Sequence, residues 1–504
     1  MKGAVGRRGA ARNGVGPASV SGLGWAGLHL ALSSAGAAVL GLLFWVVTAR
    51  LHDPQEVGAA ATLISIAVLV ATITDCGFGV SLIQFLSAVP GRERHWLVRS
   101  YAIAGGLAMV VAAVVMLVLS RTGSKVGFAG QSGPWFLTVV AGTVGWQILS
   151  LQDGALMGLT RTSWVLARSL AYQFAKIVLV VLLAGTTGAV AGTFIAWFAP
   201  AIAAAAIVNV RLFRSLPRLG RSEETNQRRP GFALSIGANY LGSLSSLAGM
   251  SLVPIIVTEA KGTRIGGFAA IPWTFFVGLQ ALTIAISLAL TAEGGRRPAD
   301  IRRLAVSATR QMCLFLFPAV AGVVLLAPQI LSVYGPDYRT ASTDLLRLLA
   351  LASLPSLLFQ VAVAVARSRG SRRTIIGLQA AAAAIGLTLT PFLLATNGIR
   401  GLGVAWLISQ SLIGLVSAVL LARWLRPLRG RAPAGYPEVS AVHAFHGVLP
   451  EADLADATDN PEPAKNLATT EPDQSAVSLA ATIVAIVVAI LIWRGTRRWR
   501  RVSW

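Results

Sequence analysis

Charged residues are scarce in this sequence. Only 12% of its 504 residues are Asp, Glu, Lys or Arg, whereas a soluble globular protein carries roughly 25%. So few charges cannot cover a water-facing surface on a chain of this length. The hydrophobic fraction is 55% and the mean hydropathy is +0.69. The composition therefore excludes a soluble protein and predicts a multi-pass membrane protein.

Patterns for disulfides, metals and nucleotides are also missing. The two cysteines, Cys76 and Cys313, both lie in apolar runs, so no disulfide framework is expected. The histidines show no metal-ligand spacing with acids or cysteines; His443 and His446 are close in sequence but lie in a polar tract. The motif GxxxxGK[ST] is absent, so the chain is not expected to hydrolyse ATP. We expect no metal and no cofactor.

Long apolar runs, in contrast, are abundant. A membrane-crossing helix needs about 20 mostly apolar residues. Twelve runs of about this length and a shorter thirteenth cover residues 26–48, 57–86, 101–119, 135–157, 166–184, 188–212, 232–257, 266–291, 306–326, 344–366, 374–396, 401–424 and 477–493. The predicted fold class is therefore all-α, with helices that span a membrane.

Lys and Arg are distributed unevenly along the chain. If the basic N-terminal tail (residues 1–25) is cytoplasmic, alternate loops should be rich in basic residues. The tail and the predicted inner loops hold 28 Lys and Arg, whereas the predicted outer loops hold 7. We therefore interpret the net charge of +23 as an orientation signal and expect no nucleic-acid partner. The predicted location is the bacterial cytoplasmic membrane, with the N-terminus in the cytoplasm.

The C-terminal region departs from this pattern. Residues 425–475 contain an acidic, Pro-containing stretch, which predicts a disordered linker. This linker is either an inert spacer or a tether for polysaccharide-biosynthesis enzymes. The apolar segment 477–493 and the arginine-rich RGTRRWRR follow within residues 476–504. We expect a thirteenth helix; pairing with a partner and lying along the inner surface are the alternatives.

Two pairs of similar stretches lie about 210 residues apart. VVTARLHDPQEVGAAATLISI (46–66) resembles IIVTEAKGTRIGGFAAI (255–271), and TTGAVAGTFIAW (186–197) resembles TNGIRGLGVAW (396–406). Two halves with an even number of helices each must have the same orientation. The repeat predicts two parallel six-helix lobes around a central cavity: an N-lobe (26–212), a basic cytoplasmic linker (213–231) and a C-lobe (232–424).

The same residues carry a family resemblance. Ala49 to Ser65 fit AxLxxPxxVGxxxxLIS and are followed by DCGFG (75–79) and LIQFL (82–86). Further motifs are VYGPDYRTASTDLLRLLALASL (333–354) and ARSRGSRRTIIGLQ (366–379). The pattern resembles bacterial polysaccharide and lipid-linked oligosaccharide flippases of the multidrug/oligosaccharidyl-lipid/polysaccharide exporter superfamily, over about residues 25–424. The resemblance implies alternating access and an undecaprenyl-pyrophosphate-linked saccharide as the substrate.

Four ionisable residues lie within or near predicted membrane helices. Such residues usually face a cavity or a partner. Because a diphosphate head group needs cations, Lys176 and Arg347 are the candidates for contacting it. The alternatives are that both extend to the membrane surface, or that Arg347 pairs with Asp344. Asp75 and Asp153 are candidates for binding a coupling ion; we favour helix-end acids neutralised by inner arginines.

Three functions are compatible with these features. The favoured hypothesis is a flippase for a lipid-linked saccharide. The first rival is an ion-coupled exporter of small molecules or drugs on the same fold, for which acids and aromatic residues in the cavity would be expected. The second is a polyprenyl-dependent membrane glycosyltransferase, with Asp53 and Glu56 as catalytic acids. Every predicted outer loop is short, so a non-enzymatic role is expected.

Overall fold

A computed structural model describes residues 36–86, 92–127, 132–216, 244, 249–296 and 298–425. Within these ranges the chain is helical apart from turns, contains no strand, and includes ten helices that are long and apolar enough to cross a membrane. The predicted all-α multi-pass fold is therefore confirmed. The N-terminal tail, most of the linker 213–231, the acidic linker and the segment 477–493 lie outside the described residues.

The helices follow the chain in two groups. The N-lobe contains the helix Gly36–Leu51, α2 (Pro54–Thr74), α3 (Phe78–Phe85), α4 (Glu93–Arg121), α5 (Gly133–Gly158), α6 (Thr162–Leu183) and α7 (Ala189–Ser215). The C-lobe contains a helix over residues 249–261, α9 (Thr263–Arg296), α10 (Ile301–Tyr334), α11 (Pro336–Ser368), α12 (Arg372–Asn397) and α13 (Ile399–Trp424).

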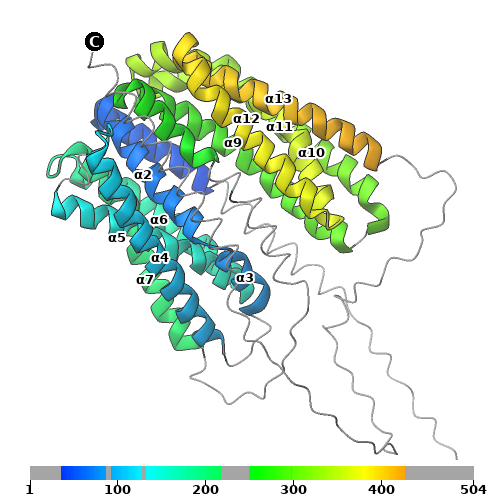
Figure 1. The fold of residues 1–504 in the computed structure, drawn as a ribbon, viewed down its shortest axis with the longest axis horizontal. Helices are drawn as coiled ribbons and strands as arrows, with labels where there is room; N and C mark the ends of the chain where they lie inside the picture. Colours follow the sequence, from blue (N-terminus) through cyan, green and yellow to red (C-terminus); the bar gives the residue numbers. More distant parts are fainter. Residues whose placement is uncertain are drawn as a thin grey trace, which may run out of the picture.

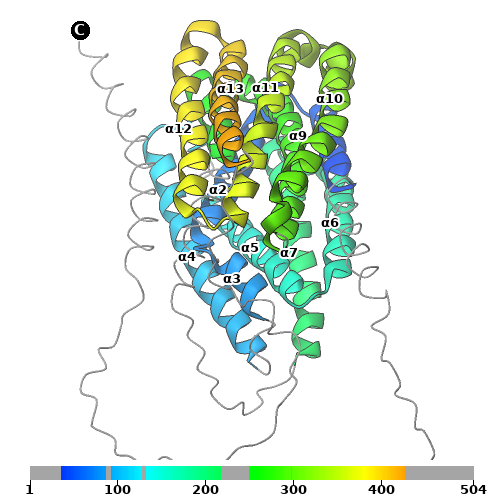
Figure 2. The same ribbon diagram turned by 90° about the vertical axis from the view of Figure 1, so that its right-hand side faces the viewer.

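The two lobes form a V. They meet at the upper left of Figure 1 and diverge toward its lower and right edges, and Figure 2 views the same arrangement from the diverging side. We call the meeting point, where α2 and α9 begin, the closed end. The other end, where α7 and α13 finish, is the diverging end. Alternate loops of each lobe therefore lie at the same end.

One predicted helix is interrupted. The sequence predicts a single helix over residues 57–86, and this is wrong: α2 ends at Thr74 and α3 begins at Phe78. Cys76 and Gly77 have left-handed backbone conformations, with φ of 47° and 80°, which a continuous helix cannot contain. The Asp75 carboxylate accepts hydrogen bonds from the backbone N–H groups of Gly77 (3.2 Å) and Gly79 (3.3 Å). These bonds supply acceptors for the first N–H groups of α3.

The lobes meet through a reciprocal crossing of α2 and α9. A Cβ placed on Gly58 would overlap the carbonyl oxygen of Thr263 and the backbone nitrogen of Gly267. A Cβ on Gly267 would in turn overlap the carbonyl oxygen of Pro54 and approach the nitrogen of Gly58. Gly58 and Gly267 are equivalent positions of the two repeated stretches, so equivalent parts of the two lobes contact each other. Small residues permit such close backbone approach between membrane helices.

Polar contacts reinforce the closed end. The Arg50 guanidinium donates to the carbonyls of Val333 (2.7 Å) and Ser332 (3.0 Å) at the C-terminus of α10, where the helix dipole favours a cation. The Glu259 carboxylate accepts from the Ser124 hydroxyl (2.5 Å) and the Lys125 N–H (3.2 Å). All these bonds join one lobe to the other.

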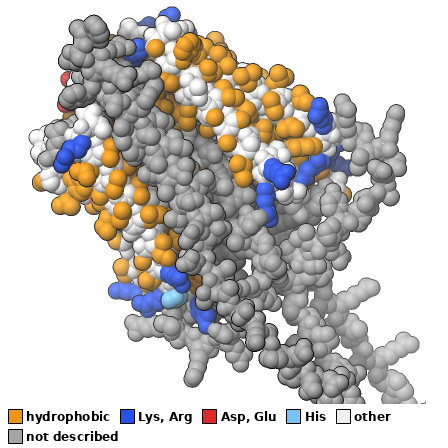
Figure 3. Space-filling model, in the orientation of Figure 1, with side chains coloured by type: hydrophobic (Ala, Val, Ile, Leu, Met, Phe, Trp, Pro, Cys, Tyr) orange, Lys and Arg blue, Asp and Glu red, His pale blue; other side chains and the backbone are white. Residues whose placement is uncertain are grey.

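The outer surface is suited to lipid. Figure 3 shows hydrophobic side chains over the visible face of both lobes, with Lys and Arg gathered at their ends. Large exposed apolar residues occur along α4 and α10 in particular, including Met109, Val110, Leu117, Leu314 and Leu325. Exposed apolar surface on this scale marks a membrane-facing protein, which confirms the multi-pass prediction.

Candidate functional site

Two charged residues are buried between the described helices, and both are basic. Among the described residues, Arg168 (8% exposed) and Lys176 (1% exposed) are the buried charged side chains. Both lie on α6, two turns apart, on the face that packs into the N-lobe. Trp164, Arg168, Tyr172 and Lys176 follow at intervals of four residues, so they line one face of the helix. This stripe is the centre of the candidate site.

Lys176 is enclosed by aromatic rings. Its Nζ lies 3.9 Å from the ring centroid of Trp197, 4.8 Å from Phe44 and 5.3 Å from Tyr172. No described carboxylate forms an ion pair with it. Cation–π contacts of this kind are worth about 2 kcal/mol when desolvated. The rings therefore offset part of the cost of burying the ammonium.

The C-lobe has an uncharged counterpart of this cage. Trp406 corresponds to Trp197 in the repeated stretches, and Gly386 of α12 lies against its ring. A Cβ on Gly386 would lie 3.2 Å from the Trp406 ring, so the glycine packs directly against the indole. The ammonium is thus a feature of the N-lobe alone.

We expect Lys176→Met to be at least as stable as the wild type. The substitution removes a buried charge that has no described carboxylate partner, and burying an unpaired charge costs several kcal/mol, more than the rings return. Lys176→Glu should lower stability, because the faces of the rings repel an anion. Thermal unfolding of the detergent-purified protein measures both. A midpoint for Lys176→Met well below the wild type would indicate a stabilising partner for the ammonium.

Arg168 is held by a polar network at the diverging end of the N-lobe. Its guanidinium pairs with Asp153 (2.5 Å) and donates to Gln152 Oε1 and the Leu149 carbonyl, each at 3.1 Å. Gln152 in turn donates to Asn209 Oδ1 (2.8 Å) on α7. The Arg168 Nε–H is buried without a hydrogen-bond partner, and so is the Tyr172 hydroxyl. Two donors of this stripe are therefore free.

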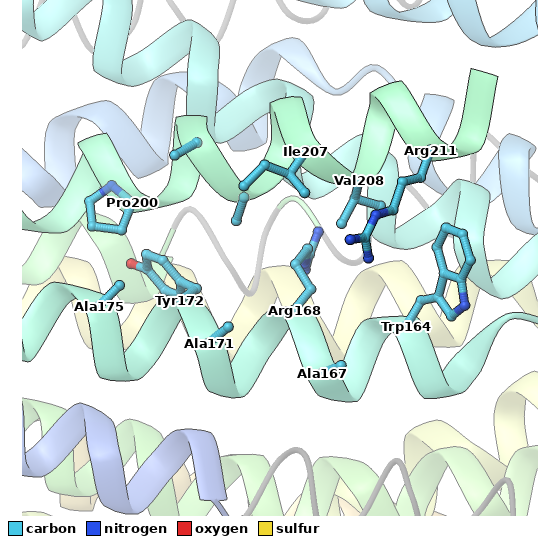
Figure 4. A pocket seen from close by; sticks show the side chains of 12 residues that line it. Trp164, Ala167, Arg168, Ala171, Tyr172, Ala175, Pro200, Ile207, Val208 and Arg211 are labelled. Carbon is cyan, nitrogen blue, oxygen red and sulfur yellow. The ribbon is translucent and has the colours of Figure 1, made fainter. Parts of the chain in front are cut away.

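These free donors lie at a pocket. It is about 490 Å³ in volume and lies between α6 and α7, lined by Trp164, Ala167, Arg168, Ala171, Tyr172, Ala175, Pro200, Ala203, Ala204, Ile207, Val208 and Arg211. Figure 4 shows Arg168 and Arg211 extending from the two facing helices into the same part of the pocket, with Tyr172 one turn away. The volume lies within the usual range for a small-ligand site. The pocket is thus basic at one end and apolar along the rest.

Arg347, the second predicted phosphate contact, lies in a different environment. Its Nε donates to the Val324 carbonyl (3.2 Å), and its guanidinium lies 4.0 Å from Asp344, which also pairs with Arg400. The pairing with Asp344 that the sequence spacing suggests is therefore present. These partners belong to the C-lobe, whereas the cage of Lys176 belongs to the N-lobe. None of the contacts described for either residue joins the two, and their roles stay predictions.

The two predicted ion-coupling acids lie near each other at the diverging end. The Asp75 carboxylate accepts a hydrogen bond from the turn before α3, and the Asp153 carboxylate forms an ion pair with Arg168. The two elements pack closely, because a Cβ on Gly154 would meet the carbonyl oxygen of Gly79 at 2.5 Å. No cluster of three potential metal ligands occurs among the described residues. A coupling role for either acid stays a prediction.

Sequence reasoning missed most of the pocket. The 28 basic residues assigned to the N-terminal tail and the predicted inner loops include Arg168, but Arg168 lies inside α6 and is buried. The four-residue spacing from Trp164 to Lys176 is the signal that could have identified this face. The contribution of Arg211 depends on the packing of α7 against α6, for which the sequence has no local signal.

Comparisons with known proteins agree with this architecture. The family described as "Polysaccharide biosynthesis protein" matches residues 26–256, somewhat less than half of the chain. No curated protein sequence matches.

Solved structures of similar fold are transporters. The inward-facing form of a multidrug resistance MATE family transporter of the MOP superfamily has 14% identity and a TM-score of 0.60, covering 77% of this chain and 94% of that one. The outward-facing form of such a transporter has 15% identity and a TM-score of 0.55, covering 79% and 95%. A MOP superfamily transporter from Pyrococcus furiosus, for which a binding pocket of reverse polarity suggests a different function, has 14% identity and a TM-score of 0.57, covering 79% and 95%.

Proposed function

We propose that this chain, which matches the family described as "Polysaccharide biosynthesis protein" over residues 26–256 and has the fold of MOP superfamily transporters, moves a lipid-linked oligosaccharide or polysaccharide repeat unit from the cytoplasmic to the outer leaflet. MOP here denotes the multidrug/oligosaccharidyl-lipid/polysaccharide exporter superfamily. Family and fold are those of transporters, so a glycosyltransferase reaction is not part of the proposal.

The basic interior of the N-lobe carries this proposal. Arg168 and Lys176 are the buried charged side chains among the described residues, and Arg211 adds a third cation at the α6–α7 pocket. Cations at membrane depth are costly and are retained where an anionic group must be accommodated. A pyrophosphate-linked lipid supplies such a group, and arginine suits phosphate through its forked donors.

Alternating access supplies the movement in this proposal. The lobes touch at the closed end and diverge at the other, where the basic loop residues lie. The positive-inside rule assigns that end to the cytoplasm, so this conformation would admit substrate from the inner leaflet. The bacterial cytoplasmic membrane is the location that fits such a substrate, and enzymes of polysaccharide biosynthesis are the partners that would supply it.

A drug exporter is the second candidate, because the similar solved structures include multidrug resistance transporters. Small cationic drugs need acidic or aromatic contacts. The aromatic cage fits such a ligand, but Lys176 occupies it, and Asp153 is paired with Arg168. The charge of the site therefore favours an anionic substrate.

Leaflet translocation in proteoliposomes tests the proposed function. We expect the purified protein to expose a fluorescent undecaprenyl-pyrophosphate oligosaccharide to an added glycosidase, whereas protein-free liposomes protect the internal fraction. If the lipid stays protected for several saccharides, with and without ion gradients, the proposal is wrong and small cations become the next substrates to test.

Variants of the two predicted phosphate contacts extend this assay. We expect Lys176→Ala and Arg347→Ala each to slow translocation about tenfold, the loss that accompanies removal of one charge-assisted hydrogen bond. Rates must be normalised to the amount of folded protein in the liposomes. Normal transport by both variants would show that neither residue contacts the phosphate.

A further inference from the structure

We propose that the α6–α7 pocket binds the phosphate at the head of an anionic prenyl lipid, with Arg168, Tyr172 and Arg211 as its ligands. The inference rests on the proposed function and names the part of the N-lobe that would recognise the substrate's phosphate. Neither Arg168, Tyr172 nor Arg211 is marked by the family motifs in the sequence.

Unsatisfied donors are the first observation. The Arg168 Nε–H and the Tyr172 O–H are buried without a hydrogen-bond partner, although the rest of the Arg168 guanidinium has three acceptors. Buried polar groups normally have partners, and a donor left unpaired destabilises the protein. Both residues line the pocket, so a turn of either side chain would bring its donor to the acceptor oxygens of a ligand inside it.

Charge is the second observation. Asp153 balances one of the two arginines of the pocket, Arg168. Arg211 forms no ion pair with any described residue, so one positive charge is left without a carboxylate. Arg168 and Arg211 extend toward each other from facing helices (Figure 4). Two like charges are stable together when an anion lies between them, and a phosphate presents oxygens in several directions at once.

The shape of the remaining lining indicates the rest of the ligand. Away from the arginines the pocket is lined by small and apolar side chains from both helices: Ala167, Ala171, Ala175, Ala203, Ala204 and Ile207. Such a lining accepts hydrocarbon and offers no hydrogen bonds to a sugar. A phosphate attached to a branched prenyl chain matches this pocket, because the pocket is basic at one end and apolar along the rest.

Tyr172 connects the pocket to the cage of Lys176. Tyr172 lines the pocket, and the centroid of its ring lies 5.3 Å from the Lys176 Nζ. A phosphate held by the hydroxyl is therefore one side chain away from the buried ammonium. The Lys176 ammonium would attract an anion held there.

Isothermal titration of the full-length detergent-purified protein tests the assignment. The probes are farnesyl pyrophosphate, farnesol, which lacks the phosphate, and inorganic pyrophosphate, which lacks the chain. We expect farnesyl pyrophosphate to bind tightest. Arg211→Gln should weaken it about ten- to hundredfold and Tyr172→Phe about three- to tenfold, as expected for one charged and one neutral hydrogen bond.

Matched variants control for general effects. Arg214→Gln removes an exposed arginine from the same helix, and Tyr101→Phe removes a hydroxyl bonded to Asn209 instead. Both should bind farnesyl pyrophosphate like the wild type. Wild-type affinity in Arg211→Gln and Tyr172→Phe would overturn the assignment, even if the liposome assay detects flipping. Equal binding of inorganic pyrophosphate would overturn the role of the prenyl chain. Loss of binding in both variants supports the pocket, even if no lipid-linked saccharide is moved.

Discussion

Gly267→Ala should open the closed end and reduce transport at least tenfold. The new methyl group would overlap the backbone of α2, which cannot move aside as a flexible side chain can. Overpacking of a well-packed interface costs roughly 1–3 kcal/mol, and a backbone clash belongs at the upper end of this range. A change of about 3 kcal/mol shifts the balance between two conformations by roughly a hundredfold. Gly58→Ala should have the same effect, because the contact is reciprocal.

A distance measurement between labels across the closed end tests this prediction. Arg121 and Arg339 are exposed residues of different lobes at this end, and each can carry a spin label as a cysteine variant once Cys76 and Cys313 are replaced by serine. Gly267→Ala should lengthen the distance. Gly278→Ala is the matched control, since it lies on the same helix and nothing lies within 4 Å of its added Cβ. Unchanged distances in Gly267→Ala would show that the crossing does not hold the lobes together.

Asp153→Ala should destabilise the N-lobe by about 3 kcal/mol or more. Removing one member of a buried pair leaves the other charge uncompensated, and losses of about 3–5 kcal/mol are typical. The Arg168 side chain is only 6% exposed, so water can do little to compensate. Asp153→Asn keeps an acceptor beside the guanidinium and should lose less. The thermal unfolding midpoint in detergent is the measurement.

An exposed ion pair provides the control. Asp337 pairs with Arg264 at 3.5 Å, with side chains that are 58% and 65% exposed, so Asp337→Ala should change stability by less than about 1 kcal/mol. Equal losses of stability in Asp153→Ala and Asp337→Ala would show that the buried ion pair contributes no more to stability than the exposed one. Asp153→Asn also tests ion coupling: if Asp153 carried the coupling ion, this variant would lose gradient-driven transport while its unfolding midpoint stayed near the wild type.

Features that depend on long stretches of sequence were predictable. The membrane helices follow from continuous apolar length, and the repeated stretches around Gly58 and Gly267 mark the two helices that meet at the crossing. Lys176 stands out because a lone lysine interrupts an apolar helix. Each of these features depends on a chemical property that is maintained over a whole helix or repeated at a fixed offset, so it can be read from the sequence.

Features that depend on a single turn or on tertiary packing were not predictable. The break after Asp75 depends on two left-handed residues, and an apolar average over residues 57–86 conceals them. The rings around Lys176 come from Phe44 and Trp197, which only the folded lobe brings together. The pocket likewise requires Arg211 of α7 to face Arg168 of α6. Sequence alone identifies the cation but not its surroundings.

The difference between the two corresponding tryptophan sites has an evolutionary consequence. Duplication of an ancestral half would account for the repeat, and both glycines at the crossing must then stay small, because a Cβ on either would overlap the backbone of the other lobe. The side chains in the interior of each lobe do not contact the other lobe at the crossing and could therefore change independently. One half has an ammonium against Trp197, and the other has a glycine against Trp406. The crossing of α2 and α9 thus stays symmetric, whereas the two lobes differ in the charge that they bury.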